Sequence, residues 1–327
     1  MIKIAGCFIL LFFAVCLFPV DTIQLNSSSG IDFLKKMEAH DYFFGQIMEI
    51  DVAGSEFYFL DNKLKNVLRI DNRTGKLINT ISSPGQGPFQ LQSPSGLRVK
   101  NNMVFVSDMG FSGIKIFQPD GKPIKEFKTA TLVFREPGLD VNAKNEIFLK
   151  CKDSKAYPAI FVYNMDGEKI RTFTSIKLEE RTQKSYILNI QFTFKLDSEE
   201  NVVVLFTTKK QIRKYDKSGT LLWEKELKNK IIDSFDTDPH WKFQENGAVH
   251  FNTSVYGMDI DRNDNIVIGH IGGGAVYDKS GKLVHLIRGD TAMYNFRFYK
   301  DKLLHVAAAG YLINIHDFVI KSENEEK

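Results

Sequence analysis

Cysteine is scarce in this chain, and its three copies cannot build a disulfide framework. Cys7 and Cys16 lie in the apolar first twenty residues, so Cys151 is the one thiol in the rest of the sequence. A small domain stapled by intrachain disulfides is therefore excluded, and stability must come from a hydrophobic core and from closure of the fold. We interpret Cys151 as a buried strand thiol and not as a nucleophile.

The chain also lacks a large excess of charge of either sign. Its formal net charge is +3, from 43 basic and 40 acidic side chains. This value is too small to favour nucleic acid or an anionic membrane as a partner. The densest basic run, residues 209–214, is expected in a strand, where alternate side chains face opposite ways. We interpret it as a solvated sheet edge protected by lysines.

Well-known catalytic motifs are missing as well. The sequence contains no Gly-x-Ser-x-Gly elbow, phosphate-binding loop or dinucleotide fingerprint, which argues against the enzyme classes that depend on them. None of the seven histidines forms a His-x-x-x-His pair or another tight zinc spacing. Residues 259–265 imitate the start of a calcium loop but lack the glycine and glutamate that such a loop needs, so they predict a hairpin turn.

One long hydrophobic run is present, at the start of the sequence. Lys3 is the sole charged residue among residues 1–20, and the 17 residues from 4 to 20 are apolar apart from breaks at Gly6 and Pro19. This pattern is typical of an export signal, and an uncleaved N-terminal anchor is the alternative because the run is at the lower length limit of a membrane span. We therefore expect an extracytoplasmic protein, whether periplasmic, at the cell surface or secreted.

A short pattern recurs through the remaining sequence. A β-rich run leads to a turn in which Asp or Asn precedes Gly, and the glycines occupy positions 75, 121, 167, 219 and 281. Glycine supplies the positive φ of a tight hairpin, and the Asx side chain caps the turn. The intervals of 46, 46, 52 and 62 residues between these glycines suit four short strands with their turns. The repeat thus predicts an all-β propeller with four-stranded blades.

A second element, an apolar hairpin with a polar turn, precedes these turns and occurs six times, over residues 50–60, 97–106, 139–149, 194–205, 258–268 and 296–306. Six inner hairpins against five outer turns indicate six blades, the last of which lacks an outer strand. A ring must close to avoid an exposed edge. We predict that a segment near Thr22 to Asn26 supplies this strand and clasps the first and last blades together. The alternative is that residues 317–320 fold back.

These patterns divide the sequence into three parts. Residues 1–20 are the signal peptide or anchor, residues 21–320 a single propeller domain, and residues 321–327 a polar, flexible tail. The expected blades cover about residues 46–81, 93–128, 136–175, 187–228, 250–288 and 292–320, the last completed by the N-terminal strand.

One connector resembles a known group. Residues 83–90, Ser-Pro-Gly-Gln-Gly-Pro-Phe-Gln, lead to residues 94–99, Pro-Ser-Gly-Leu-Arg-Val. This stretch resembles the NHL-type connector of six-bladed propellers, in which a Gly-rich loop containing Phe leads to Pro-x-Gly, an apolar residue, any residue and Val. Over roughly residues 45–320, the chain looks most like bacterial exported six-bladed β-propeller proteins of unassigned role. The resemblance implies the fold but not a function.

Propeller sites usually lie at one mouth of the channel, and we expect this one on the face with the loops that join an outer strand to the next inner strand. The longest such loop is residues 229–255, and the charged loop of residues 175–189 is expected to border the same mouth. The candidate ligand-binding residues are His240, Trp241, His250, Tyr256, Arg135 and Arg297.

The expected function is a monomeric binding or scaffolding module for an extracytoplasmic protein, peptide or glycan, with no nucleic-acid partner and no cofactor. Its contact with a membrane is expected only through the N-terminal anchor, if this is retained. The alternative is a lactonase- or lyase-like enzyme with calcium or zinc at the channel mouth. Its candidate ligands are His250, His270 and His305, although the last two occupy second-strand positions typical of packing residues. No catalytic residue can be assigned from the sequence.

Overall fold

The computed structural model describes residues 21–24, 44–129, 138–152, 158–173, 191–228, 241–243, 249–251, 255–270, 273–288, 293, 295–300, 302–307 and 312–317. All regular secondary structure in these ranges is β-strand. The same ranges contain no helix with the length and apolar character needed to cross a lipid bilayer. Residues 1–20 and 321–327, the expected signal and tail, lie outside the described residues.

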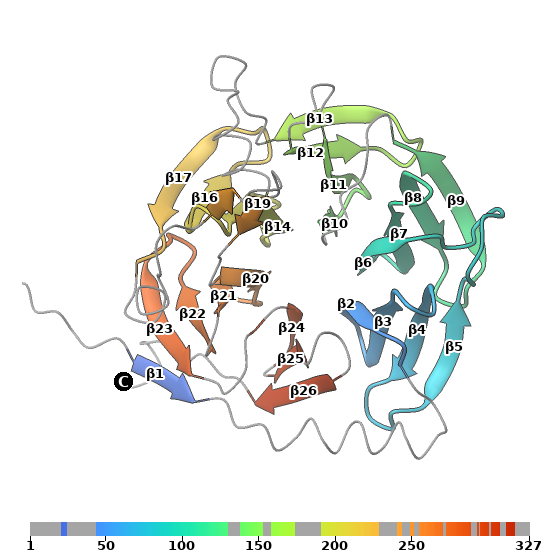
Figure 1. The fold of residues 1–327 in the computed structure, drawn as a ribbon, viewed down its shortest axis with the longest axis horizontal. Coiled ribbons are helices and arrows are strands. Elements are labelled where there is room, and N and C mark those ends of the chain that lie inside the picture. Colours follow the sequence, from blue (N-terminus) through green and yellow to red (C-terminus); the bar gives the residue numbers. More distant parts are fainter. Residues whose placement is uncertain are drawn as a thin grey trace, which may run out of the picture.

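The strands form radially arranged antiparallel sheets (Figure 1). The first blade comprises β2 (Ile47–Ala53), β3 (Glu56–Asp61), β4 (Asn66–Asp71) and β5 (Leu77–Ile81), and the second comprises β6 (Pro94–Lys100), β7 (Met103–Asp108), β8 (Gly113–Phe117) and β9 (Pro123–Lys128). The third comprises β10 (Leu139–Val141), β11 (Ile147–Lys152), β12 (Pro158–Tyr163) and β13 (Lys169–Phe173).

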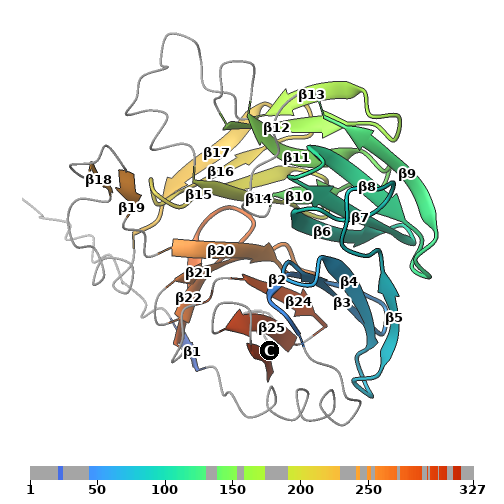
Figure 2. The same ribbon diagram turned by 45° about the vertical axis from the view of Figure 1, so that its right-hand side comes forward.

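The fourth blade comprises β14 (Phe192–Leu196), β15 (Val202–Phe206), β16 (Gln211–Tyr215) and β17 (Leu221–Glu226). The fifth comprises β20 (Val255–Ile260), β21 (Ile266–His270), β22 (Gly273–Tyr277) and β23 (Leu283–Arg288), and a sixth sheet has the described strands β24 (Asn295–Tyr299), β25 (Lys302–Ala307) and β26 (Leu312–Asp317). A hairpin of β18 (Trp241–Phe243) and β19 (Val249–Phe251) stands apart from these sheets (Figure 2). The prediction of an all-β propeller with four-stranded blades is confirmed.

The N-terminal strand lies on the fifth blade and not on the last. β1 (Asp21–Gln24) pairs in parallel with the outer strand β23, with Asp21 opposite His285 and Gln24 opposite Arg288. The prediction that this segment completes the last blade was therefore wrong. Every outer strand offers an edge of backbone N–H and C=O groups, and backbone pairing does not read side chains. The repeat pattern could show that a strand was missing but could not say which edge a distant segment would choose.

Side chains join the sixth sheet to the first blade. Leu304 of β25 is buried in the core cluster of the first blade. The ring of Tyr299 packs edge-on against Phe57, with 5.8 Å between centroids, and the side-chain amide of Asn295 donates a hydrogen bond to the carbonyl of Met48. In the part of the chain that the structure describes, the first and last sheets are thus held together by packing and polar contacts and not by a shared strand.

Removal of β1 is expected to lower stability moderately. A chain that begins after residue 24 loses the four-residue parallel strand on β23, and we expect a free energy of unfolding lower by about 1–3 kcal/mol than in a chain that begins at residue 21. Urea denaturation of the two truncated chains measures the difference. Identical unfolding midpoints would contradict the pairing of β1 with β23.

Two further sequence interpretations concern residues outside the site. Cys151 is buried in β11 and is not part of a disulfide, as expected. The basic run is not a sheet edge, because β16 lies between β15 and β17 in the fourth blade. Lys214 is largely buried and its ammonium lies 2.7 Å from Asp197 Oδ2. The strand was predicted correctly. The sequence of a strand does not show, however, whether the strand lies at the edge of its sheet or inside it.

Buried carboxylates fix where the inner strands of the first two blades begin. Asp61 and Asp108 end the second strands of their blades, and each accepts hydrogen bonds from backbone N–H groups on two sides. One set of donors lies at the entry to the inner strand, at residues 45 and 46 or 92 and 93, and the other in the turn after the second strand. The inner strands therefore enter the ring at a defined height, which aligns their side chains around the axis.

Candidate functional site

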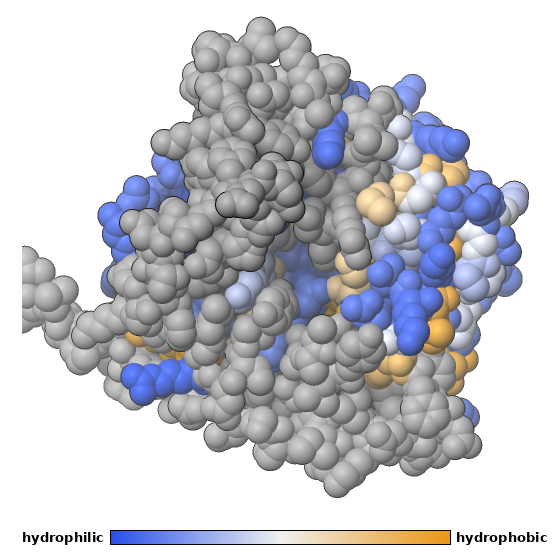
Figure 3. All heavy atoms as spheres, in the orientation of Figure 1, coloured by the Kyte–Doolittle hydropathy of each residue, from blue (hydrophilic) through white to orange (hydrophobic). Residues whose placement is uncertain are grey.

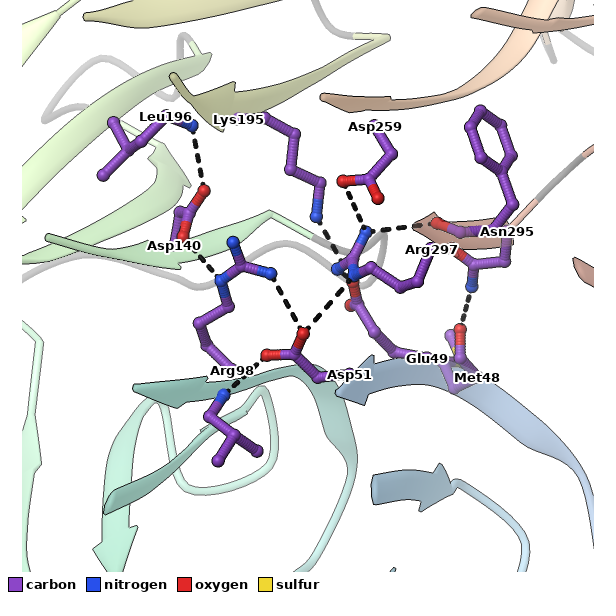
Figure 4. A network of polar contacts seen from close by, with 12 residues as sticks. Met48, Glu49, Asp51, Arg98, Asp140, Lys195, Leu196, Asp259, Asn295 and Arg297 are labelled. Atoms are coloured by element: carbon purple, nitrogen blue, oxygen red, sulfur yellow. Dashed lines mark hydrogen bonds and ion pairs between the residues drawn. The ribbon is translucent and has the colours of Figure 1, made fainter. Parts of the chain in front are cut away.

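The innermost strand of each sheet contributes one charged side chain at the same position of its hairpin. Each of these residues pairs with a residue seven or eight positions later on the second strand, and each is followed by an apolar residue. In chain order the charges alternate in sign (Figure 4). The six residues, called here the charge ring, are Asp51, Arg98, Asp140, Lys195, Asp259 and Arg297.

The aspartates of the ring tie the blades together in pairs. Each accepts a hydrogen bond on Oδ2 from the backbone N–H that follows the basic residue of the next blade. The three bonds run from Val99 to Asp51 at 2.6 Å, from Leu196 to Asp140 at 2.9 Å and from Phe298 to Asp259 at 2.9 Å. The six sheets are therefore linked as three pairs, each with an acidic blade followed by a basic one.

Arg98 connects the first pair to the second. Its Nη1 lies 3.1 Å from Asp51 Oδ1, and its Nε lies 2.6 Å from Asp140 Oδ1. The same Oδ1 atoms accept hydrogen bonds from the backbone N–H groups of Val52 and Val141. Both oxygens of Asp51 and of Asp140 are therefore occupied by donors. Although burial alone would raise the pKa of Asp140, Arg98 and its other donors lower it.

Deeper in the channel, Glu49 contacts two basic members of the ring. Arg297 Nη2 forms an ion pair with Glu49 Oε1, and Lys195 Nζ lies 3.8 Å from the same oxygen. Burial raises the pKa of Glu49, although both cations oppose this effect. Burial, with repulsion from Arg297, lowers the pKa of Lys195 to about 8. Burying Glu49, Lys195 and Arg297 removes their hydration, which is unfavourable, and the attraction between the opposite charges offsets this loss.

A cavity of about 670 Å³ lies above the charge ring. Asp51, Arg98, Asp259 and Arg297 contribute to its wall, together with residues 53–56 of the β2–β3 turn and residues 100–102 of the β6–β7 turn. It therefore opens on the face that carries the inner hairpin turns. The space-filling view shows hydrophilic residues in the hollow at the centre of the ring (Figure 3).

This cavity is not on the face that the sequence favoured. Strands alternate in direction within a blade, so the loops that join outer to inner strands emerge on the opposite face. Most of residues 175–189 and 229–255, which were expected to border the site, lie outside the described residues. The prediction rested on the length of the loop at residues 229–255. The cavity is instead built from short turns, and nothing in the length of these turns marks them in the sequence.

Hydrogen bonds between neighbouring turns surround part of the same mouth. The turns of the second to fifth blades are joined in series, by Asn101 to Asn145 at 2.6 Å, by Ala143 to Glu200 at 3.1 Å and by Ser198 to Asp264 at 2.8 Å. The cavity wall instead comes from the first, second, fifth and sixth sheets. Turn contacts therefore join the second to fifth blades at the mouth, and the cavity lies on the side of the first and sixth sheets, with the second and fifth blades shared by both.

The predicted ligand-binding residues fall in different places. Arg297 lies in the charge ring, and Tyr256 is half-buried in β20. Trp241 and His250 belong to the β18–β19 hairpin, where only their backbone is described. His240 and Arg135 lie outside the described residues. Of the two members of this set whose side chains are described, Arg297 contributes to the cavity wall and Tyr256 does not.

The histidines proposed for a metal are not gathered at the mouth. His270 and His305 are buried at second-strand positions, and the side chain of His250 is not described. Among the described residues, no three His, Cys, Asp or Glu side chains are grouped so that they could hold a metal ion. Residues 261–265 form a hairpin turn, as predicted, with Asp261 accepting from the backbone N–H groups of Asn263 and Asn265.

Sequence reasoning found the six inner hairpins but missed the charge ring within them. The available signal was positional. When the six hairpins are aligned on their turns, the second or third residue before each turn reads Asp, Arg, Asp, Lys, Asp and Arg. A solvated strand face has no reason to alternate in sign from blade to blade, whereas side chains that converge on one axis do.

Comparison with known proteins supports the architecture. No protein-family model matches the chain, and no curated protein matches it. Virginiamycin B lyase from Staphylococcus aureus is similar in structure, with 13% identity, a TM-score of 0.54 and coverage of 85% of this chain and 86% of the lyase. The gluconolactonase XC5397 from Xanthomonas campestris has 12% identity, a TM-score of 0.56 and coverage of 84% and 88%.

Nidogen, solved in complex with laminin, has 14% identity, a TM-score of 0.54 and coverage of 76% of this chain and 83% of its own. All three are six-bladed propellers. The fold is a β-propeller. At these identities the similarity shows the fold alone, and the three proteins include two enzymes and a protein solved with a protein partner.

Proposed function

We propose that this chain is an exported six-bladed β-propeller that acts outside the cytoplasm as a binding or scaffolding module for a protein, peptide or glycan. The apolar residues 1–20 and the scarcity of cysteine support export without disulfides. The observation that carries the binding role is the cavity of about 670 Å³ on a fixed polar floor. Cavities of this size suit a ligand or a protruding segment of a partner.

The bonding of two carboxylates of the charge ring favours a structural role for them over a catalytic one. A general base needs a free lone pair and a pKa near the working pH. Asp51 and Asp140 instead use both oxygens to hold neighbouring blades and Arg98, and the pKa of Asp140 is lowered. These carboxylates act as structural anions, which keep the cavity wall rigid and so reduce the entropy lost when a ligand binds.

Affinity capture tests the proposal. Tagged protein starting at residue 21 would be incubated with envelope extract of the native host, and we expect one partner or glycan to be retained. Filling the mouth with Ser55→Trp, in the β2–β3 turn, should abolish retention. Lys217→Trp, at an exposed turn of the fourth blade, should not.

Two results would contradict the proposal. The first is equal retention by both tryptophan variants, which would place binding away from the cavity. The second is ring opening of a lactone by the purified chain with loss of that activity in Ser55→Trp, which would support the enzyme alternative instead.

A further inference from the structure

Two members of the charge ring each have one polar atom that makes no hydrogen bond to a described residue, although one of these atoms forms an ion pair. Arg98 uses Nε and Nη1 for Asp140 and Asp51, and no described residue accepts a hydrogen bond from its Nη2 (Figure 4). Asp259 uses Oδ2 for the N–H of Phe298. Its Oδ1 lies 3.6 Å from Arg297 Nη1, beyond hydrogen-bond distance. The side chain of Arg98 is 19% exposed and that of Asp259 is 8% exposed.

Both residues line the same cavity. Arg98 and Asp259 come from the second and fifth blades, and both belong to the cavity wall. Their other polar atoms are fixed by contacts across blade boundaries. The cavity therefore presents one hydrogen-bond donor and one acceptor at fixed positions. Polar groups held in this way fix the orientation of a bound ligand.

The surrounding charges select against an ionic ligand. A carboxylate that approached Arg98 Nη2 would lie next to the carboxylates of Asp51 and Asp140, which already neutralise this guanidinium. An ammonium group at Asp259 would lie next to Arg297. Like charges at such short range repel strongly in a partly buried site. A hydroxyl group avoids both repulsions, because it can accept from Arg98 and donate to Asp259 without adding charge.

An apolar surface accompanies the two polar atoms. Phe298, Ile260 and Val52 contribute to the cavity wall, and all three side chains are partly exposed. An aromatic ring beside hydrogen-bonding groups is suited to a molecule with one apolar and one polar face, such as a pyranose ring with its C–H groups on one side.

We propose that the cavity binds a neutral glycan, with Arg98 Nη2 donating to one of its hydroxyl groups, Asp259 Oδ1 accepting from another, and Phe298 covering the ring carbons. This inference rests on the proposed binding function and narrows it from three classes of ligand to one. It also assigns recognition to the face of the inner hairpin turns.

A glycan array with neutral and acidic oligosaccharides, run beside an immobilised peptide library, tests this assignment. We expect protein starting at residue 21 to bind neutral glycans and not the peptides. The affinity of Asp259→Asn for the best neutral glycan should fall about tenfold or more, as for loss of a hydrogen bond to a charged group. Phe298→Leu should also weaken binding while leaving the backbone bond to Asp259 in place.

The matched control is Asp166→Asn, an exposed aspartate in the β12–β13 turn that pairs with Lys125, and it should bind as the unmodified protein does. Thermal unfolding of each variant shows whether it is folded, and Phe298→Leu decides the test if Asp259→Asn is not. Binding to peptides alone would overturn this inference and leave the proposed function standing. Preferential binding of acidic glycans, or no binding in either format, would likewise overturn it, and the affinity capture described above decides the proposed function separately.

Discussion

Replacing Arg98 by methionine is expected to lower the free energy of unfolding by about 3–5 kcal/mol. The guanidinium is the shared partner of Asp51 and Asp140, whose side chains are only 6% and 1% exposed. Methionine fills a similar volume but removes the cation that contacts both buried carboxylates, although Arg297 Nε remains 3.7 Å from Asp51 Oδ1. Urea denaturation followed by tryptophan fluorescence or circular dichroism measures the loss.

The matched control is Arg69→Met. Arg69 forms a comparable pair with Glu56 at 2.6 Å in the cavity wall, but both side chains are about one-fifth exposed, at 21% and 22%. Water can replace this partner, so we expect a loss of only about 1 kcal/mol or less. Equal losses in the two variants would show that the charge ring does not hold the blades.

Stability is expected to rise between about pH 8 and pH 10.5 because of Lys195. Burial, with repulsion from Arg297, lowers the pKa of this lysine to about 8 from the ordinary value of 10.5. Below pH 8 the Lys195 amine is protonated in both the folded and the unfolded chain, so it does not make the free energy of unfolding depend on pH. Within the window the unfolded chain retains a proton that the folded chain has released, so a rise in pH favours folding. The gain from this residue is on the order of 3 kcal/mol across the window.

Lys195→Met tests this assignment, because methionine cannot titrate. Unfolding free energies measured in urea at several values of pH should increase from pH 8 to pH 10 in the unmodified protein and increase less in the variant. The exposed residue Lys217 supplies the control, and Lys217→Met should keep the full increase. Parallel pH profiles for Lys195→Met and the unmodified protein would refute a lowered pKa at Lys195.

The local repeat could be predicted from sequence because each of its signals acts within a few residues. The five turn glycines at positions 75, 121, 167, 219 and 281 all have positive φ, between 71° and 96°. In each of these turns the glycine N–H donates to the carbonyl of the Asp, Asn or Gln that opens it. Steric limits on φ and short-range hydrogen bonds leave a direct trace in the sequence.

The parts that escaped prediction depend on contacts between distant segments. The edge chosen by β1 is set by backbone hydrogen bonds to residues 285–288, which no side-chain pattern encodes. The cavity depends on how far Arg98 and Asp259 reach toward a common axis, and this follows only once the blades are placed around it. Arg297 was named as a candidate without the reason that the structure supplies, which is its contact with Glu49.

The alternation of sign around the axis has a numerical consequence. Acidic and basic side chains can alternate around a closed ring only when the number of blades is even. A chain shortened or lengthened by a single repeat would bring two carboxylates, or two cations, into adjacent places with little water between them. The repeating unit of this architecture would then be a doublet of one acidic and one basic repeat, with successive aspartates of the charge ring 89 and 119 residues apart, and three such doublets would account for the whole ring.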